Sequence, residues 1–237
     1  MNVRVNAHRQ PIGPALAAWS ERRRPERTAI EGRYCRIEPV DLERHAAQLF
    51  ESYMQAPDGR DWTYLFSERP ANIKLFREYL ARLAASDDPL HYAIVAAENH
   101  SAVGTAALMR IDTLHGVLEV GSIAYSPLLK STPAGTEAMY LLMRRVFDEL
   151  GYRRYEWKCD SLNAPSCAAA ERYGFRFEGI FRNAVVYKKR SRDTAWFSII
   201  DEEWPQLRTA FQMWLDPQNF DSAGRQRRAL AKFRDSI

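Results

Sequence analysis

The segment from residue 117 to residue 160 constrains the fold of this 237-residue chain most. A strand-like run over 117–125 is followed by a helical pattern over 133–150 and by a second strand-like run over 154–160. Proline stands in the first turn of the predicted helix and Gly151 follows its last residue, as is usual for helix starts and stops. Such a strand–helix–strand crossover joins parallel strands, so the sheet must be mixed if its other strands are antiparallel.

The remaining predicted elements place this crossover within an α+β fold. Runs at 91–97, 102–111 and 117–125 are separated by turn residues and predict an antiparallel meander. Apolar spacing and strand-like runs predict the other elements: a strand at 33–40, helices from about Asp41 and over 72–84, a short helix at 163–173, and strands at 175–187 and 193–200. We expect a mixed, mostly antiparallel sheet with flanking helices in one domain over 31–205, preceded by an arm (1–30) and followed by a helical extension (206–237).

Composition and charge narrow the class of protein. No apolar run approaches the roughly 18 residues of a membrane span, the start lacks the apolar stretch of a signal peptide, and the three cysteines form no C-x-x-C pair. These features predict a cytoplasmic protein with reduced thiols, and the five histidines show no metal-ligand spacing. The net charge is +4 over residues 1–30, +3 over 221–237 and −3 between them.

The basic ends favour solvated tails over a nucleic-acid interface, because no recognition helix or aromatic-rich basic face accompanies them. An interaction or nucleic-acid role for these tails remains the alternative from another functional class. Predicted exposed strands, together with aromatic residues of the C-terminal helices, also suggest a homodimer; these aromatics are Phe211, Trp214 and Phe220.

The loop between the strand at 117–125 and the helix at 133–150 is a candidate anion site. It brings one cation and several small or hydroxyl residues to a helix N-terminus, where unpaired N–H groups and the helix dipole attract anions: Lys130, Ser131, Thr132, Gly135 and Thr136. An ordinary Ser/Thr-capped helix explains the same residues equally well. The spacing is not that of a P-loop, and no paired acidic motif suggests magnesium.

Five short motifs occur around this loop in a fixed order: Thr136–Ala138 (TEA), Asn163–Ser166 (N-x-x-S), Gly174–Phe175, Glu178–Gly179 and Arg192–Thr194. With the predicted elements, the stretch from about Arg33 to Pro205 resembles the GNAT superfamily of N-acetyltransferases, in particular its ribosomal-protein N-terminal acetyltransferase (RimJ/RimL-like) branch. The resemblance implies a splayed central strand pair and direct acetyl transfer from acetyl-CoA to a primary amine, on a peptide or protein N-terminus or a small molecule. A non-catalytic acyl-CoA-binding member of the same fold is the alternative.

The resemblance also assigns cofactor-binding residues. The family's phosphate loop, [Q/R]-x-x-G-x-[G/A], corresponds to 130–135, where Pro133 replaces the middle glycine and removes one N–H donor. The expected pyrophosphate contacts are Lys130, Ser131, Thr132, Ala134, Gly135 and Thr136. The pantetheine arm is expected to pair, like an added strand, with the backbone of Ile123, Ala124 and Tyr125, and to meet Asn163, which would also cap its helix.

Direct transfer requires a base for the amine, and Glu119 is the candidate because strand alternation places it on the face of Gly121 and Ile123. A solvent-facing glutamate, with a water chain acting as base, is the alternative. Ser166 of the N-x-x-S motif is the candidate donor to the departing thiolate. The candidate acceptor-side residues are three aromatics that core packing would explain as well, namely Trp62, Tyr64 and Phe66.

Overall fold

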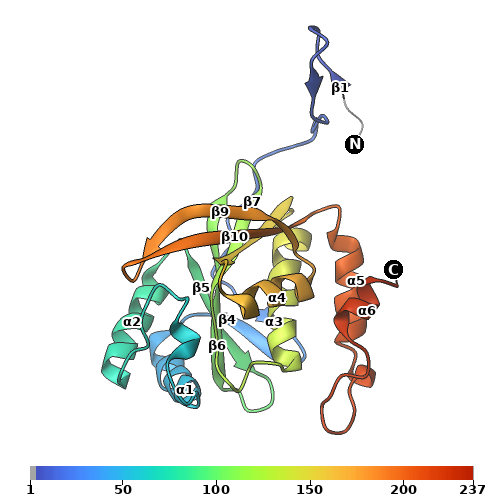
Figure 1. Ribbon diagram of the computed structural model, residues 1–237. Helices are drawn as coiled ribbons and strands as arrows, with labels where there is room; N and C mark the ends of the chain where they lie inside the picture. The colour runs from blue at the N-terminus through green and yellow to red at the C-terminus, as the bar shows by residue number, and fades with distance from the viewer. Residues whose placement is uncertain (1–3, 237) are drawn as a thin grey trace.

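The computed structural model describes residues 4–236 and contains one large mixed sheet with helices on both faces (Figure 1). The order of its strands is β3-β4-β5-β6-β7-β8-β10-β9. Within the described residues, β7 and β8 are parallel and the other neighbours are antiparallel, which confirms the predicted mixed α+β fold. The strands are β3 (Ile30–Glu31), β4 (Cys35–Pro39), β5 (Leu90–Ala96), β6 (Ala102–Asp112), β7 (Val117–Tyr125), β8 (Arg154–Asp160), β9 (Arg176–Tyr187) and β10 (Arg190–Ile200).

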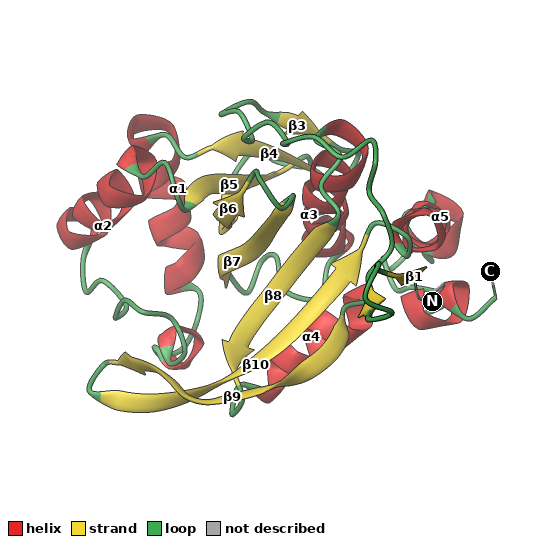
Figure 2. Ribbon diagram, turned by 90° about the horizontal axis from the view of Figure 1, so that it is seen from above, coloured by secondary structure: helices red, strands yellow, loops and turns green. Residues whose placement is uncertain are grey.

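Two helices cover one face of the sheet, and the others lie on the opposite side (Figure 2). The first pair is α1 (Leu42–Met54) and α2 (Ile73–Ala85), whose N-caps Asp41 and Asn72 accept hydrogen bonds from backbone N–H groups three residues on. The opposite side carries α3 (Pro133–Arg144), α4 (Ala164–Tyr173), α5 (Trp204–Trp214) and α6 (Leu230–Arg234). A separate apolar core fills each side of the sheet.

The helix predicted over 133–150 changes character at its end. The α-helix stops at Arg144, and a π-helical turn, η2 (Arg145–Glu149), completes it. The side chain of Arg145 is only 7% exposed and donates to the Thr28 and Ala29 carbonyls, while its Nε lies 2.9 Å from Glu149 Oε2. The wider turn therefore accompanies a buried arginine that joins α3 to the N-terminal arm, a contact between distant parts of the sequence that periodicity does not reveal.

The N-terminal arm has two parts. A short hairpin of β1 (Arg4–Val5) and β2 (Pro11–Ile12) projects from the body (Figure 1), whereas residues 19–29 lie along the domain. Trp19 Nε1 donates to the Leu114 carbonyl, and the Arg27 guanidinium donates to the Ala84 carbonyl at the end of α2. Part of the basic charge of the arm is therefore used within the protein.

The C-terminal aromatics do not support the predicted homodimer. Phe211 is fully buried and Trp214 is 3% exposed, because α5 packs these rings inward, where Phe211 stacks on Tyr140 of α3. Phe220 is partly buried and packs edge-on against Trp214. These aromatics, which suggested a homodimer, instead pack into the core on the α3 side of the sheet.

Glu137, the central residue of the TEA motif, ties α3 to the start of the sheet. Its buried carboxylate accepts three backbone N–H groups, from Arg33 (2.9 Å), Tyr34 (2.6 Å) and Cys35 (2.8 Å). Gly32 allows this close approach, since a Cβ there would lie 2.5 Å from Glu137 Oε2. The carboxylate thus provides hydrogen-bond acceptors for three consecutive N–H groups in the turn between β3 and β4, of which that of Cys35 belongs to a buried residue.

We predict that Glu137→Gln lowers the free energy of unfolding by about 2 kcal/mol, because a neutral amide accepts these N–H groups less well and brings its own N–H₂ against them. The matched control is Glu51→Gln, at an exposed position on α1, where we expect no measurable change. Urea unfolding followed by circular dichroism measures both. Equal stability of the two variants would show that the carboxylate does not hold the turn.

Candidate active site

The parallel pair β7–β8 separates halfway along its length. The two strands pair from Val117 opposite Arg154 to Val120 opposite Trp157, and beyond these residues β7 and β8 are no longer paired. Immediately afterwards β7 bulges: its register against β6 shifts at this point, and Ser122 has φ 48°, in the left-handed region. A bulge bends its strand, so β7 turns away from β8, and the β8-facing backbone edge of residues 123–125 is left without a strand partner.

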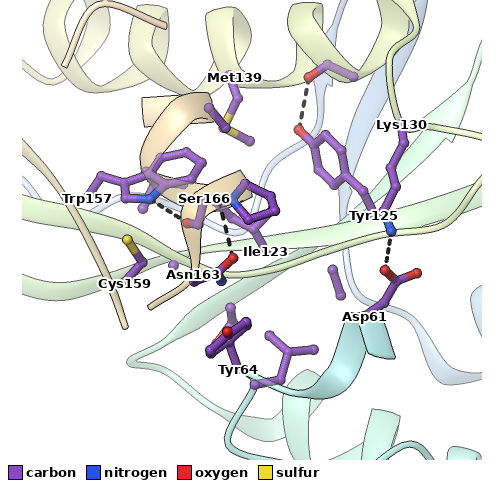
Figure 3. A pocket seen from close by; sticks show the side chains of 18 of the residues that line it. Asp61, Tyr64, Ile123, Tyr125, Lys130, Met139, Trp157, Cys159, Asn163 and Ser166 are labelled. Carbon is purple, nitrogen blue, oxygen red and sulfur yellow. Dashed lines mark hydrogen bonds and ion pairs between the residues drawn. The ribbon is translucent and has the colours of Figure 1, made fainter. Parts of the chain in front are cut away.

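A cavity of about 1640 Å³ lies at this separation (Figure 3). Its walls come from β7, β8, β10, the N-terminal end of α4, the loop before α3 and the loop after α1. Apart from Ala134, every residue that the sequence analysis singled out for catalysis or binding lines it. The fold therefore gathers into one cavity candidate residues that are spread over more than a hundred positions of sequence.

The N-terminus of α3 forms one end of the cavity. Thr132 is its N-cap, with Oγ1 accepting from Gly135 N at 3.1 Å, and Pro133 occupies the first helical position, which needs no N–H partner. The backbone N–H groups of Ser131 and Ala134 donate to no other group within residues 4–236. Gly135 is required sterically, since a Cβ would lie 2.6 Å from the Leu129 carbonyl oxygen. Capping and two available donors are thus both present, as an anion site requires.

Lys130 has a partner that the sequence did not suggest. Its Nζ lies 2.5 Å from Asp61 Oδ1, across the cavity from the α3 loop (Figure 3). Asp61 belongs to the short turn η1 (Arg60–Trp62), almost 70 residues away in sequence. An anion that binds Lys130 must therefore compete with this carboxylate.

Ser166 and Asn163 lie at the start of α4, facing β7 across the cavity. Asn163 caps the helix, with Oδ1 accepting from Ser166 N at 3.3 Å. Ser166 Oγ accepts a hydrogen bond from Trp157 Nε1 at 3.0 Å, so its own hydroxyl hydrogen can turn either to the neighbouring Cys159 thiol or to the cavity (Figure 3). Nearby Cys159 is a buried free thiol whose pKa is raised to about 12, mainly by burial, which makes it a poor nucleophile.

Glu119 is buried, with 4% exposure, so the alternative of a solvent-facing glutamate is wrong. It sits opposite Glu156 on β8, and Lys158 lies between them, with Nζ 3.1 Å from Glu119 Oε2 and 2.6 Å from Glu156 Oε2. Arg110 Nη1 is 3.5 Å from the same Glu119 oxygen. Burial raises the pKa of Glu119, and the two cations partly offset that rise.

Lys158 was missed by the sequence analysis. A signal was present, because Glu156, Lys158 and Asp160 alternate along a strand expected in the centre of the sheet. Charged residues on one face of a central strand must face a polar site rather than a core. In the structure, the side chain of Lys158 is only 5% exposed, and its ammonium also lies 3.8 Å from the ring centroid of Trp196 on β10.

The three candidate acceptor aromatics differ in their surroundings. Trp62 is 4% exposed and packs edge-on against Tyr53 and Tyr79, so it belongs largely to the core beneath the cavity wall. The Tyr64 hydroxyl donates to the Leu162 carbonyl at 3.0 Å, whereas Phe66 is 61% exposed and rests against Tyr187. Their loop is therefore held against the start of α4 and the β9–β10 hairpin.

The described residues form neither a metal site nor a membrane-spanning helix. Among residues 4–236, no group of three or more His, Cys, Asp or Glu side chains is arranged to hold a metal ion. In the same part of the chain, no helix is both long and apolar enough to span a membrane.

Comparison with known proteins identifies the family. Residues 35–176 match the family model of the acetyltransferase (GNAT) domain, and the chain belongs to this family. The crystal structure of a GCN5-related N-acetyltransferase from Brucella melitensis is 50% identical, with a TM-score of 0.91 over 93% of this chain and 100% of that one. A probable GNAT-family acetyltransferase from Chromobacterium violaceum is 39% identical, with a TM-score of 0.76 over 83% and 98% of the two chains.

A curated relative, the probable N-acetyltransferase YjcK of Bacillus subtilis (strain 168), is 32% identical over 114 residues. This match spans 47% of the present chain and 61% of the relative. Together with the family model and the similar structures, it supports an acetyltransferase enzyme, and GNAT domains as a family use acetyl-CoA.

We predict opposite pKa shifts of Glu119 when its two neighbours on β8 are neutralised. Lys158→Met removes a cation that lowers the pKa of Glu119, so the pKa should rise further; Glu156→Gln removes a carboxylate that raises it, so the pKa should fall. Carbon-13 NMR titration of labelled glutamate carboxyls measures both, with the signal assigned by its loss in Glu119→Gln. A shift of the Glu119 pKa in the same direction in both variants would contradict the placement of Lys158 and Glu156 beside this carboxylate.

Proposed function

We propose that the protein is an acetyl-CoA-dependent N-acetyltransferase that transfers the acetyl group directly to a primary amine in a ternary complex. One observation carries this proposal: the separation of β7 from β8 forms a cavity with an anion site at the N-terminus of α3 and a buried carboxylate, Glu119, where the strands still pair. The amine belongs to a peptide or protein N-terminus or to a small molecule.

The residues of the cavity fit acetyl-CoA, which when bound supplies an acetyl group activated as a thioester. The free backbone edge of residues 123–125 suits the amide groups of a pantetheine arm, and Asn163 faces this edge from α4. Lys130 and the N–H groups of Ser131 and Ala134 suit a pyrophosphate. Pro133 has no backbone N–H to donate, but the N–H groups of Ser131 and Ala134 remain available.

Glu119 is positioned to take the proton of the acceptor amine. Burial raises its pKa and makes it a stronger base than an exposed glutamate, while Lys158 and Arg110 keep its charge compensated. Ser166 can donate its hydroxyl hydrogen to the leaving sulfur, because its oxygen already accepts from Trp157. A peptide α-amine, with a pKa of about 8, is easier to deprotonate than a lysine amine at about 10.4.

Two finer assignments belong to the same proposal. The N-x-x-S motif at 163–166 supports the RimJ/RimL-like branch, since its serine lies at the cavity where that branch requires a hydroxyl. A cytoplasmic location agrees with the three free thiols, Cys35, Cys159 and Cys167.

Calorimetric titration with acetyl-CoA tests the cofactor site. We expect Lys130→Ala to weaken binding about tenfold through loss of a charge-assisted contact. Asp61→Asn should bind acetyl-CoA at least as tightly as the wild type, because it removes the carboxylate that competes for Lys130. Lys74→Ala, at an exposed position on α2, is the control. Absence of binding up to millimolar acetyl-CoA would refute the proposal.

Steady-state acetylation of an amine panel tests the catalytic roles. Glu119→Gln should lower kcat/KM by about 10²-fold or more, as expected for loss of a general base, with acetyl-CoA affinity retained. Ser166→Ala should lower kcat only by about threefold, since a thiol with a pKa of about 8.5 leaves readily as thiolate. Unchanged turnover in Glu119→Gln would instead favour a water chain as base, and acetyl-CoA binding without turnover of any amine would favour the non-catalytic alternative.

A further inference from the structure

Arg192 of β10 is a buried residue whose cation has no acidic partner in the part of the chain that the structure describes. The residue is 7% exposed and lines the cavity, and its Nε donates to Thr194 Oγ1 at 3.1 Å. No carboxylate within residues 4–236 lies within 4.0 Å of its nitrogens. A guanidinium has five N–H donors, and only one of those of Arg192 is used within the described part of the chain.

Arg145 provides a comparison within the same molecule. It is equally buried, at 7% exposure, but donates to carbonyl groups of Thr28 and Ala29 and pairs with Glu149 at 2.9 Å. In Arg192 the guanidinium nitrogens that make no hydrogen bond are instead open to the cavity, where solvent or a ligand can reach them. The environment of Arg192 therefore lacks the compensation that the protein supplies to Arg145.

The surroundings of Arg192 offer aromatic faces rather than an acid. Its guanidinium carbon lies 5.8 Å from the ring centroid of Phe66 and 6.0 Å from that of Tyr187. Asp160 lies opposite Thr194 on the neighbouring strand, but its carboxylate accepts from the Tyr187 hydroxyl at 2.7 Å and from Leu162 N at 2.9 Å. The rings hold the guanidinium in place and leave its remaining N–H groups for a ligand.

The position of Arg192 relates it to the proposed base. Arg192, Thr194 and Trp196 alternate along β10 and share one face, and the Trp196 ring contacts Lys158, which contacts Glu119. Nε of Arg192 donates to Thr194, whose position on the strand is two residues, or about 7 Å, from that of Trp196. Arg192 and Glu119 both line the cavity, so one acceptor bound there can face both side chains.

We infer that Arg192 binds a carboxylate of the acceptor, so that the acceptor is a primary amine carrying a carboxylate several bonds from its nitrogen. The inference rests on the proposed function and names its substrate class. A guanidinium and a carboxylate form paired, charge-assisted hydrogen bonds, which would compensate the buried charge and orient the amine toward Glu119. Such a carboxylate belongs either to a free amino acid or to an acidic side chain near a peptide N-terminus.

Matched acceptors that differ by one charge test the inference. The small-molecule arm compares 5-aminopentanoate with 5-aminopentanamide, and the peptide arm compares Ala-Glu-amide with Ala-Gln-amide. In the wild type, at least one carboxylate acceptor should exceed its amide in kcat/KM by about tenfold or more. Which arm shows the preference identifies the source of the carboxylate.

Variants of two arginines assign the preference to one residue. In Arg192→Gln the carboxylate-to-amide ratio should fall to near one, and Arg192→Lys should retain part of it. Arg182→Gln, at an exposed position on β9, should keep the wild-type ratio. Calorimetry on Arg192→Gln should give an acetyl-CoA Kd within about twofold of that of the wild type. Weaker binding of acetyl-CoA, together with an unchanged carboxylate-to-amide ratio of kcat/KM, would overturn the inference and assign Arg192 to the cofactor.

Ligand-observed NMR of the same acceptors separates the inference from the proposed function. Preferential binding of a carboxylate acceptor that is lost in Arg192→Gln, but without acetyl transfer, would support the inference and refute the enzyme. If the wild type acetylates the acceptors with a carboxylate-to-amide ratio of kcat/KM near one, the result would support the proposed enzyme activity and overturn the inference. Equal binding of all four acceptors would also overturn it.

Discussion

The separation of β7 from β8 is the constraint on which the rest of the site depends. Two parallel strands that stop pairing at Val120 and Trp157 expose backbone groups in the middle of a sheet, where a buried polar group needs a partner. The bulge at Ser122 produces this separation, and α4, the α3 loop and the η1 loop enclose the space that results. A sheet paired along its full length would have neither the cavity nor the free strand edge.

Charge compensation explains how polar residues persist next to this cavity. Glu119, Lys158 and Glu156 form a compact group on two paired strands, and each buried charge there has an opposite charge within about hydrogen-bonding distance. Arg192, further along the same face, has no such partner among residues 4–236, and the hydrogen bond it makes goes to Thr194. The two buried cations thus suggest different tasks: Lys158 adjusts the carboxylate beside it, whereas Arg192 is available to an acidic ligand.

Much of the fold was predictable because its elements carry strong local signals. The strands at 117–125 and 154–160 were predicted with their observed bounds, and Asp41, Asn72 and Asn163 mark helix starts through side chains that accept the first N–H groups. The errors arose where distant segments meet. Phe211 and Trp214 suggested a homodimer, because the pattern of one helix cannot show that α3 covers its apolar face.

By itself, the sequence determined the order of the elements, the mixed sheet and the identity of most residues at the cavity, since periodicity, capping residues and short motifs act over a few positions of chain. Only the tertiary structure decided their electrostatic state. The pairing of Lys130 with Asp61, the burial of Glu119 beside Lys158 and the isolation of Arg192 depend on residues brought together from different strands and loops. Distance and burial set the strength of charge interactions, and the order of residues along a chain specifies neither.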